Sequence, residues 1–281
     1  MDASTQETQG QVTIRRSGSG EPLVLIHGLG GRWQHFEPVI DDLARDFDVI
    51  AVDLPGFGET PLLQGVRPGP KGYSAWLAGW LAEEGIQRPH IVGNSMGGAI
   101  ALELARTTEL SSVTVFSPAG FYRMPGLMWS GGVLMTMRLA YRLGGPITRA
   151  ALGTATGRRA MLGAVVAHPT QMTSADARDT VKALASGKAF APARNSHLTY
   201  RISAAENGAV SAHAPTTITW GTGDRLLIYR TQSRRARAAY PAARHVDLEG
   251  CGHVPFGDDP TACARVIRET AAEASSLAAP E

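Results

Sequence analysis

Short apolar runs, each followed by a turn and then by a longer helical stretch, recur along this chain of 281 residues. Such alternation is typical of a mostly parallel sheet flanked by helices, so the sequence predicts the α/β fold class. Six runs are predicted as strands buried on both faces of that sheet: 23–26, 49–52, 91–92, 113–116, 216–220 and 244–248. Ligands bind beyond the carboxyl ends of such strands, so the turns that follow them are where chemistry is expected.

No strand is predicted between residues 117 and 216. This connection is far longer than the usual connection of about 2 to 6 residues. We therefore predict a helical cap, residues 119–200, inserted into a core formed by residues 1–118 and 201–281. The cap segment has ten basic and two acidic residues, a net charge of +8, whereas the rest of the chain carries −6. It also holds six of the eight methionines, whose flexible side chains suit adaptable apolar surfaces.

Composition excludes several classes of protein. Hydrophobic residues make up 43% of the chain and charged residues 19%, which allows a sizeable core and excludes wholesale disorder. The net charge of +2 gives no global electrostatic footprint for nucleic acid, so no nucleic-acid partner is expected. Two cysteines, Cys251 and Cys263, are too few for a disulfide scaffold or a four-cysteine metal site. We expect no metal and no cofactor.

Two features bear on location. The N-terminal segment 1–11 lacks the basic and apolar regions of a secretory signal, so a cytoplasmic protein is expected. The uncharged run 124–137 has 14 residues, whereas a helix that spans a membrane needs about 20. We therefore expect no integral membrane segment, and the sequence leaves the oligomeric state open.

Ser95 lies in a Gly-x-Ser-x-Gly motif, residues 93–97, directly after a predicted strand and before a helical run. A tight turn from strand to helix needs glycines on both sides of the serine, because other backbone passes close by. The serine oxygen is then exposed at the positive end of the helix. This placement predicts that Ser95 is a nucleophile, with simple capping of the helix as the alternative.

Two further residues complete a catalytic triad in the turns after the last two predicted strands. His253 has an imidazole that can take a proton from a serine near neutral pH and then return it. Asp224 places a carboxylate where it can orient that imidazole. Three other carboxylates compete for this role, but Asp247 lies within a strand, and Asp258 and Asp259 begin a helix that they can cap.

The chain order Ser95, Asp224, His253 is that of the α/β-hydrolases. Together with His-Gly-Leu-Gly-Gly at 27–31 and Asp-Leu-Pro-Gly-Phe-Gly at 53–58, it makes the chain resemble the α/β-hydrolase superfamily over nearly its whole length. The resemblance implies an α/β-hydrolase fold with an inserted cap and chemistry that needs no cofactor. It argues against haloalkane dehalogenases and epoxide hydrolases, because these use an aspartate nucleophile.

The resemblance also implies that the backbone N–H groups of Leu29 and Met96 form an oxyanion hole, which would stabilise a tetrahedral intermediate. His27 and Asp53 are predicted to anchor their turns by hydrogen bonds and to take no part in catalysis. One departure from the family pattern concerns the edge of the sheet. Only about 20 residues precede the strand 23–26, so the customary antiparallel hairpin is predicted to be shortened.

These residues lead to the hypothesis of a serine hydrolase that cleaves a carboxylic ester of a small or medium lipophilic substrate through an acyl-enzyme. One alternative is a carbon-carbon bond hydrolase of the meta-cleavage type, which the turn at 93–98 resembles, although the loop at 28–31 lacks the usual Gly-Pro-Gly-Ala sequence. A second is a tailoring hydrolase or cyclase of secondary metabolism. A non-enzyme alternative is a ligand receptor with slow turnover.

Five residues are candidate contacts for a small-molecule substrate. Asn94 precedes the nucleophile, and Met128 and Met135 are apolar side chains of the cap. Arg138 and Arg142 are spaced i to i+4 on one face of a predicted cap helix, where they could attract acidic substrates to the pocket entrance. The alternative for both arginines is a solvated helix surface.

Overall fold

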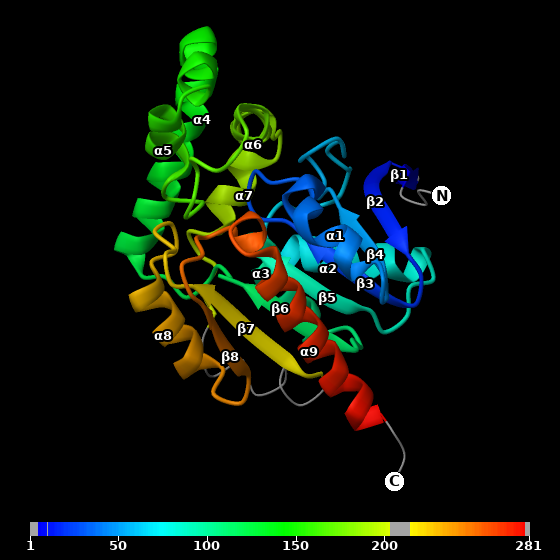
Figure 1. The fold of residues 1–281 in the computed structure, drawn as a ribbon. Helices are drawn as coiled ribbons and strands as arrows, with labels where there is room; N and C mark the ends of the chain where they lie inside the picture. Colours follow the sequence, from blue (N-terminus) through cyan, green and yellow to red (C-terminus); the bar gives the residue numbers. More distant parts are fainter. Residues whose placement is uncertain (1–4, 10, 203–213, 279–281) are drawn as a thin grey trace.

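The computed structural model describes residues 5–9, 11–202 and 214–278, which form one eight-stranded sheet flanked by helices (Figure 1). The strand order is β1-β2-β4-β3-β5-β6-β7-β8. The strands are β1 (Thr5–Gln9), β2 (Val12–Gly18), β3 (Glu21–Ile26), β4 (Phe47–Val52), β5 (His90–Asn94), β6 (Ser112–Phe116), β7 (Thr216–Gly221) and β8 (Arg244–Leu248). Strands β3 to β8 are all parallel, so their carboxyl ends meet at one edge of the sheet.

An antiparallel hairpin extends the other end of the strand order. β1 pairs with β2 along five residues, and β2 pairs with β4, both in antiparallel fashion. The sequence predicted a shortened hairpin, but strands of five and seven residues fit before β3. Both strands of the hairpin are therefore present.

Side chains alternate across the sheet and enter two separate hydrophobic cores. In β3, Val24 and Ile26 belong to one core, whereas Leu23 and Leu25 belong to the other. The first core is covered by α2 (Pro70–Glu83), α3 (Met96–Leu104) and α8 (Tyr229–Ala239), and the second by α1 (Glu37–Leu43) and α9 (Pro260–Ala278). Burial on both faces explains why these strands read as continuous apolar runs in the sequence.

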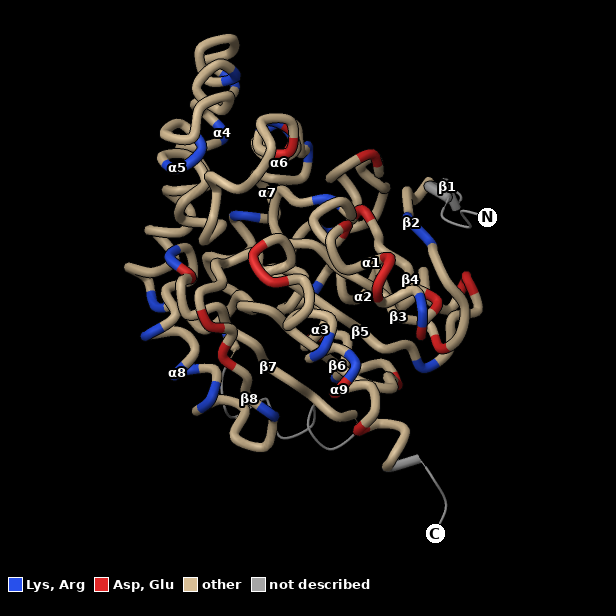
Figure 2. Tube along the Cα trace, viewed as in Figure 1, with Lys and Arg blue, Asp and Glu red and all other residues tan. Residues whose placement is uncertain are grey.

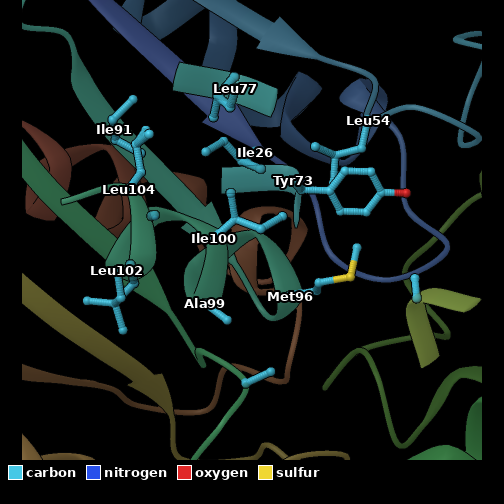
Figure 3. Close-up of a cluster of buried hydrophobic side chains, with 14 of the residues drawn as sticks. Ile26, Leu54, Tyr73, Leu77, Ile91, Met96, Ala99, Ile100, Leu102 and Leu104 are labelled. Carbon is cyan, nitrogen blue, oxygen red and sulfur yellow. The ribbon is translucent and has the colours of Figure 1, made fainter. Parts of the chain in front are cut away.

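Helix α3 is buried along its length, and this fixes the turn from which it starts. Met96, Ala99 and Ile100 are fully buried, and Figure 3 shows them in one cluster with Ile26 of β3 and Tyr73 of α2. Burying a large apolar side chain contributes about 1.5 to 3 kcal/mol. Because α3 cannot rotate without losing these contacts, the residue that precedes it is held in place.

The described residues between β6 and β7 form four α-helices beyond the carboxyl edge of the sheet (Figure 1). They are α4 (Met124–Leu152), α5 (Ala155–Leu162), α6 (Ser174–Ser186) and α7 (Phe190–Ser196), and we call residues 119–200 the cap. Helix α4 bends where Gly145 has φ +39° and Pro146 follows it. Its far end stands away from the sheet (Figure 1), and lysine and arginine positions mark both α4 and α5 (Figure 2).

Candidate active site

Ser95 occupies the sharp turn between β5 and α3. Its backbone has φ +57° and ψ −115°, a conformation that costs a residue with a side chain about 1 to 3 kcal/mol and that is often found at functional sites. A Cβ atom on Gly93 would collide with the Gly97 carbonyl, and one on Gly97 would collide with the Ile26 carbonyl. The Gly-x-Ser-x-Gly spacing therefore follows from the close approach of β3, β5 and α3.

His253 and Asp224 form a buried pair in the turns after β8 and β7. His253 Nδ1–H donates to Asp224 Oδ2 at 2.8 Å, and both side chains are almost completely buried. The other carboxylate oxygen accepts the backbone N–H groups of Leu226 and Leu227, each at 2.9 Å. These bonds fix the carboxylate and leave His253 Nε2 available in the cavity that it shares with Ser95.

The three competing carboxylates have other partners. Asp247 pairs with an arginine of α8 at 2.7 Å. Asp259 accepts a backbone N–H in the first turn of α9 at 2.9 Å and so caps that helix. Asp258 accepts the N–H of Gly252 at 2.8 Å and that of Ala167 at 3.2 Å, which ties the turn after β8 to the cap. Among the described residues, none of these three carboxylates bonds to the imidazole of the pair.

Asn94, predicted as a substrate contact, lines the cavity that holds Ser95 and His253 and also positions the histidine turn. Its Nδ2 donates to the His253 carbonyl at 2.9 Å and to the Phe116 carbonyl at 3.0 Å. An amide nitrogen has two hydrogens, so both are used by these backbone acceptors. The side chain joins β5, β6 and the His253 turn, and its amide nitrogen has no hydrogen left for a substrate.

Two backbone N–H groups near Ser95, those of Leu29 and Met96, have no acceptor among the described residues. Met96 begins α3, where an N–H has no partner within the helix and the helix dipole is positive. Leu29 lines both of the cavities that Ser95 lines. A Cβ on the preceding Gly28 would lie only 2.9 Å from Ser95 Cβ, so this loop approaches the serine closely. Two unpaired donors beside a serine can stabilise an oxyanion.

The loop after β3 is held by His27 and Asp53, the two residues predicted to anchor turns. His27 Nε2 accepts the Leu54 N–H at 3.0 Å, and Nδ1–H donates to the Gly28 carbonyl at 2.8 Å. Burial lowers the pKa of His27 to about 4, so the ring is neutral near pH 7. Asp53 accepts the Trp33 N–H at 2.8 Å, and burial raises its pKa to about 6. Both side chains are committed to backbone groups.

Ser95 lines two small cavities. The first, of about 50 Å³, also has His253 in its wall, and the second, of about 40 Å³, has Met96 and Tyr122. Leu134 of α4 lines both, so the cap covers the serine. One water-sized group needs about 10 to 15 Å³ of such volume, so each cavity admits only a few heavy atoms.

The α4 side chains in these walls differ from those predicted. Met128 is 70% exposed, and Met135 packs against the core without lining either cavity. The α4 residues that line the two cavities are Leu127, Ser130, Gly131, Leu134 and Met137. One residue turns a helix by about 100°, so a neighbour in sequence faces another direction. The two predicted methionines are thus replaced by residues one or two positions away.

Arg138 and Arg142 bind α4 to the end of α6 and do not line either cavity beside Ser95. Arg138 donates to the carbonyls of Leu184 and Gly187. Arg142 Nε donates to the Ala185 carbonyl at 2.9 Å. The last carbonyls of a helix lack partners within it, and cationic side chains satisfy them well. These donors hold α4 against the end of α6. Attraction of acidic substrates by the charge of this pair stays a prediction.

Three groups at the site carried no clear sequence signal. Tyr122 Oη lies 2.8 Å from His197 Nδ1, and both line the second cavity. Burial lowers the pKa of His197 to about 4 and raises that of Tyr122. His35 lines the first cavity, and burial, with smaller effects of His27 and Arg32, lowers its pKa to about 3. Only its place just after the 27–31 motif could have pointed to His35.

The described ranges offer neither a cluster of metal ligands nor a helix that could span a membrane. No group of three or more His, Cys, Asp or Glu side chains there is placed to hold a metal ion. No helix in the same ranges is long and apolar enough to cross a membrane. Cys251 and Cys263 are buried free thiols, and burial raises the pKa of both, that of Cys251 to about 12. Such thiols are poor nucleophiles.

A model of the alpha/beta hydrolase family matches residues 23–266. A 2-hydroxy-6-oxo-2,4-heptadienoate hydrolase of Pseudomonas putida is 38% identical over 98 residues, 34% of this chain and 36% of that protein. A pimeloyl-[acyl-carrier protein] methyl ester esterase of Aeromonas salmonicida is 39% identical over 97 residues, again 34% and 36%. The chain spans between 29% and 74% of the length of the first curated relatives that it matches.

Solved structures share the fold across nearly the whole chain. A thermophilic esterase from Thermogutta terrifontis has a TM-score of 0.73 at 21% identity, covering 98% of this chain and 99% of that one. A similarity at this sequence identity shows a shared fold and does not indicate the substrate.

Proposed function

The chain belongs to the alpha/beta hydrolase family, and we propose that it is a cofactor-independent serine hydrolase that cleaves a carboxylic ester through an acyl-enzyme. One observation carries this proposal. The strained Ser95 shares a cavity with His253, and the imidazole of His253 is bonded to the buried carboxylate of Asp224 at 2.8 Å.

In this mechanism, His253 Nε2 removes the hydroxyl proton of Ser95 as the serine oxygen attacks the ester carbonyl. Asp224 orients the ring through Nδ1–H and stabilises the imidazolium that forms. The imidazolium then gives its proton to the leaving alcohol oxygen. In the second half, His253 deprotonates a water as it attacks the acyl-enzyme carbonyl. The imidazolium then returns that proton to the Ser95 oxygen as the bond to the acyl carbon breaks, which releases the acid and restores the serine hydroxyl.

The tetrahedral intermediate of each half carries a negative oxygen. The unpaired N–H groups of Leu29 and Met96 are proposed to bind that oxygen. Because these donors are fixed before the reaction, they need no reorganisation, and one such bond is worth about 3 to 4 kcal/mol in the barrier. The apolar walls around Ser95 favour a small or medium lipophilic substrate.

Hydrolysis of a carbon-carbon bond is the second candidate, because the Pseudomonas putida relative is named for a dienoate substrate. Substrates of that kind carry a carboxylate, which needs a cationic partner in the pocket. Arg138 and Arg142 line neither cavity beside Ser95, whereas Arg194 lines the second and offers a dienoate a cation. We rank ester cleavage first because the other residues in both walls are mostly apolar.

The test measures kcat/KM on p-nitrophenyl acetate, p-nitrophenyl butyrate and a dienone acid for the native chain and for Ser95→Ala. We expect hydrolysis of the nitrophenyl esters, a loss of about 10³-fold or more in Ser95→Ala, and an unchanged melting temperature. Ser275→Ala, an exposed serine of α9, is the matched control. More than about a tenth of native activity in Ser95→Ala would overturn the proposal, and faster turnover of the dienone acid would favour the second candidate.

A further inference from the structure

Helix α4 carries an unusual number of exposed apolar side chains. Nine large apolar side chains of the described residues are exposed to solvent, and six of these belong to α4. The six are Met124, Met128, Trp129, Leu139, Leu143 and Ile147. Exposed apolar residues that are scattered singly are normal on a protein, but a group of them on one element marks an interaction surface.

The spacing of these residues places them on one side of the helix. Met128 and Leu139 are 11 residues apart, which is about three turns, and Leu143 follows Leu139 by about one turn. Leu134, which lines both cavities beside Ser95, precedes Leu139 by five residues and is therefore about 140° away around the helix. Helix α4 is thus apolar on its inner side and on its outer side, whereas a surface helix of a soluble protein normally has a polar outer side.

We call the exposed residues Met128, Trp129, Leu139, Leu143 and Ile147 the outer face. Its two most exposed members, Leu143 and Ile147, lie on either side of the bend at Gly145, and each is at least 80% exposed. Thr148 Oγ1–H donates to the Ala140 carbonyl at 2.6 Å across this bend and so holds it. This far end of α4 stands away from the sheet (Figure 1). The apolar side chains therefore lie on a firm projection.

The surface around the outer face is strongly basic. Residues 119–173 hold six arginines and no aspartate or glutamate. The ion pair that reaches the cap among the described residues joins Arg32 to Asp179 of α6, so none of those six arginines has a carboxylate partner. Trp129 Nε1–H donates to the Arg225 carbonyl at 2.8 Å, which sets the outer face beside the start of α8.

Helix α8 extends this basic surface. It has four arginines and no acidic residue, and one of the four, Arg237, pairs with Asp247 of β8. Figure 2 shows the basic positions of α4, α5 and α8 along one side of the molecule. The apolar outer face is therefore bordered by positive charge.

Positive charge and apolar side chains together indicate the partner. A second copy of the chain would bring two caps, each with a net charge of +8, face to face, and repulsion between like charges opposes that contact. Nucleic acid would match the charge but presents phosphates, which give the leucines nothing to pack on. A bilayer that contains anionic lipids offers both, because its headgroups attract arginine and its acyl chains accept apolar side chains.

The shape of the surface fits the same partner. A projection can enter a fluid bilayer, whereas a protein partner would need a groove that matches it. No helix of the described ranges, α4 included, is long and apolar enough to cross a membrane, but a helix with an apolar side and neighbouring arginines can lie in the plane of the interface. Trp129, at one end of the outer face, is a residue type that membrane interfaces favour.

We propose that the outer face of α4 docks this protein on membrane surfaces that contain anionic lipids. Leu143 and Ile147 enter the acyl-chain region, and the arginines of the cap and of α8 lie among the headgroups. The residues of the outer face line neither cavity beside Ser95. The proposal therefore concerns a second site and does not depend on ester hydrolysis.

The first test measures how the native chain partitions onto sedimented vesicles. One set of vesicles is phosphatidylcholine alone, and the other contains about 30% phosphatidylglycerol. We expect the partition coefficient on the anionic vesicles to be at least about tenfold higher. It should fall when salt is raised from about 0.05 M to about 0.5 M, because salt screens the attraction between arginines and headgroups.

The second test removes one apolar contact. Leu143→Ser should lower the partition coefficient on anionic vesicles by about tenfold or more, because a leucine side chain that enters the acyl chains is lost. Leu62→Ser is the matched control, since Leu62 is an exposed leucine outside the cap, and it should change the coefficient by less than about twofold. Both variants should keep the native melting temperature, because both side chains are exposed.

The third test removes one positive charge. Arg149→Gln, in the exposed far part of α4, should lower the partition coefficient on anionic vesicles by about fivefold and leave that on phosphatidylcholine unchanged. Arg45→Gln is the matched control, since Arg45 is an exposed arginine of the core that follows α1. It should change neither coefficient.

Three results with vesicles would overturn the proposal. They are an absence of binding to anionic vesicles, equal binding to both kinds of vesicle, and equal losses in Leu143→Ser and Leu62→Ser. Analytical ultracentrifugation without vesicles examines the second copy. If the native chain is a dimer and Leu143→Ser is a monomer, a second copy covers the outer face and the membrane assignment is wrong.

Discussion

The core and the cap differ in net charge and in how far they bury the same types of residue. Leu25 of β3 is fully buried between the sheet and its helices, whereas Leu143 of α4 is 83% exposed and Ile147 is 80% exposed. The cap carries +8 and the rest of the chain −6. The core buries its apolar residues on both faces of a sheet, so its sequence pattern reports burial directly. In the cap, the same residue types reach solvent, so the apolar pattern of the sequence does not predict which side chains are buried.

This difference in burial determines which region can hold the proposed catalytic groups in fixed positions. Ser95, Asp224 and His253 all follow core strands. The Ser95 N–H donates to the Phe116 carbonyl at the end of β6 at 2.9 Å, and His253 bonds to Asp224 in the turn after β7 at 2.8 Å. The cap contributes the cavity walls, through side chains such as Leu134. The core thus fixes the reacting groups, and the cap shapes what reaches them.

The largest effect is expected in the core. Asp224→Asn should lower kcat/KM for p-nitrophenyl acetate by about 10⁴-fold with little loss of stability, because an amide cannot hold the imidazole in the right tautomer or stabilise its cation. Asp247→Asn, on the neighbouring β8, is the control and should retain activity, since that carboxylate pairs with an arginine. Steady-state kinetics and circular dichroism measure both. Equal losses in the two variants would refute the assigned role of Asp224.

The same contrast explains which parts of the site could be predicted from the sequence. The proposed nucleophile and its proposed partners could be predicted because glycine spacing and strand ends are local signals. Met128 and Met135 could not be told from Leu127 and Leu134, because α4 is apolar on several sides and only packing sets which side faces the serine. The contacts of Arg138 could not be predicted from the sequence either, since its partners are carbonyls about 46 residues away in the chain.

Acid should weaken both regions, by a few kcal/mol. Burial lowers the pKa of His27 in the core and of His197 in the cap to about 4, below the ordinary 6.5. Between these values the unfolded chain binds protons that the folded chain does not, so stability is lost as pH falls from 6.5 to 4, by up to about 1.4 kcal/mol per pH unit for each ring. Asp53 opposes this, because burial raises its pKa to about 6 and the folded chain gains stability on protonating it.

The measurement is the free energy of unfolding in urea at pH 7 and at pH 4.5. The native chain should be less stable at the lower pH, and His197→Asn should lose less between the two values than the native chain does. Asp53→Asn should lose more, since the opposing group is gone. Equal losses in all three proteins would mean that these side chains do not control the response to acid.

The smallest effect is expected at the exposed end of α4. Leu143→Ala should change the free energy of unfolding by no more than about 0.5 kcal/mol, because the side chain is 83% exposed and alanine is an excellent helix former. Leu25→Ala, the same substitution in the core, should cost about 2 to 5 kcal/mol. Urea titrations of both variants at one protein concentration make the comparison. A cost above about 1 kcal/mol for Leu143→Ala would mean that another surface covers this end of the cap in solution. Repeating the titration at tenfold lower protein concentration would then tell whether that surface belongs to a second copy of the chain, because only a contact between copies weakens on dilution.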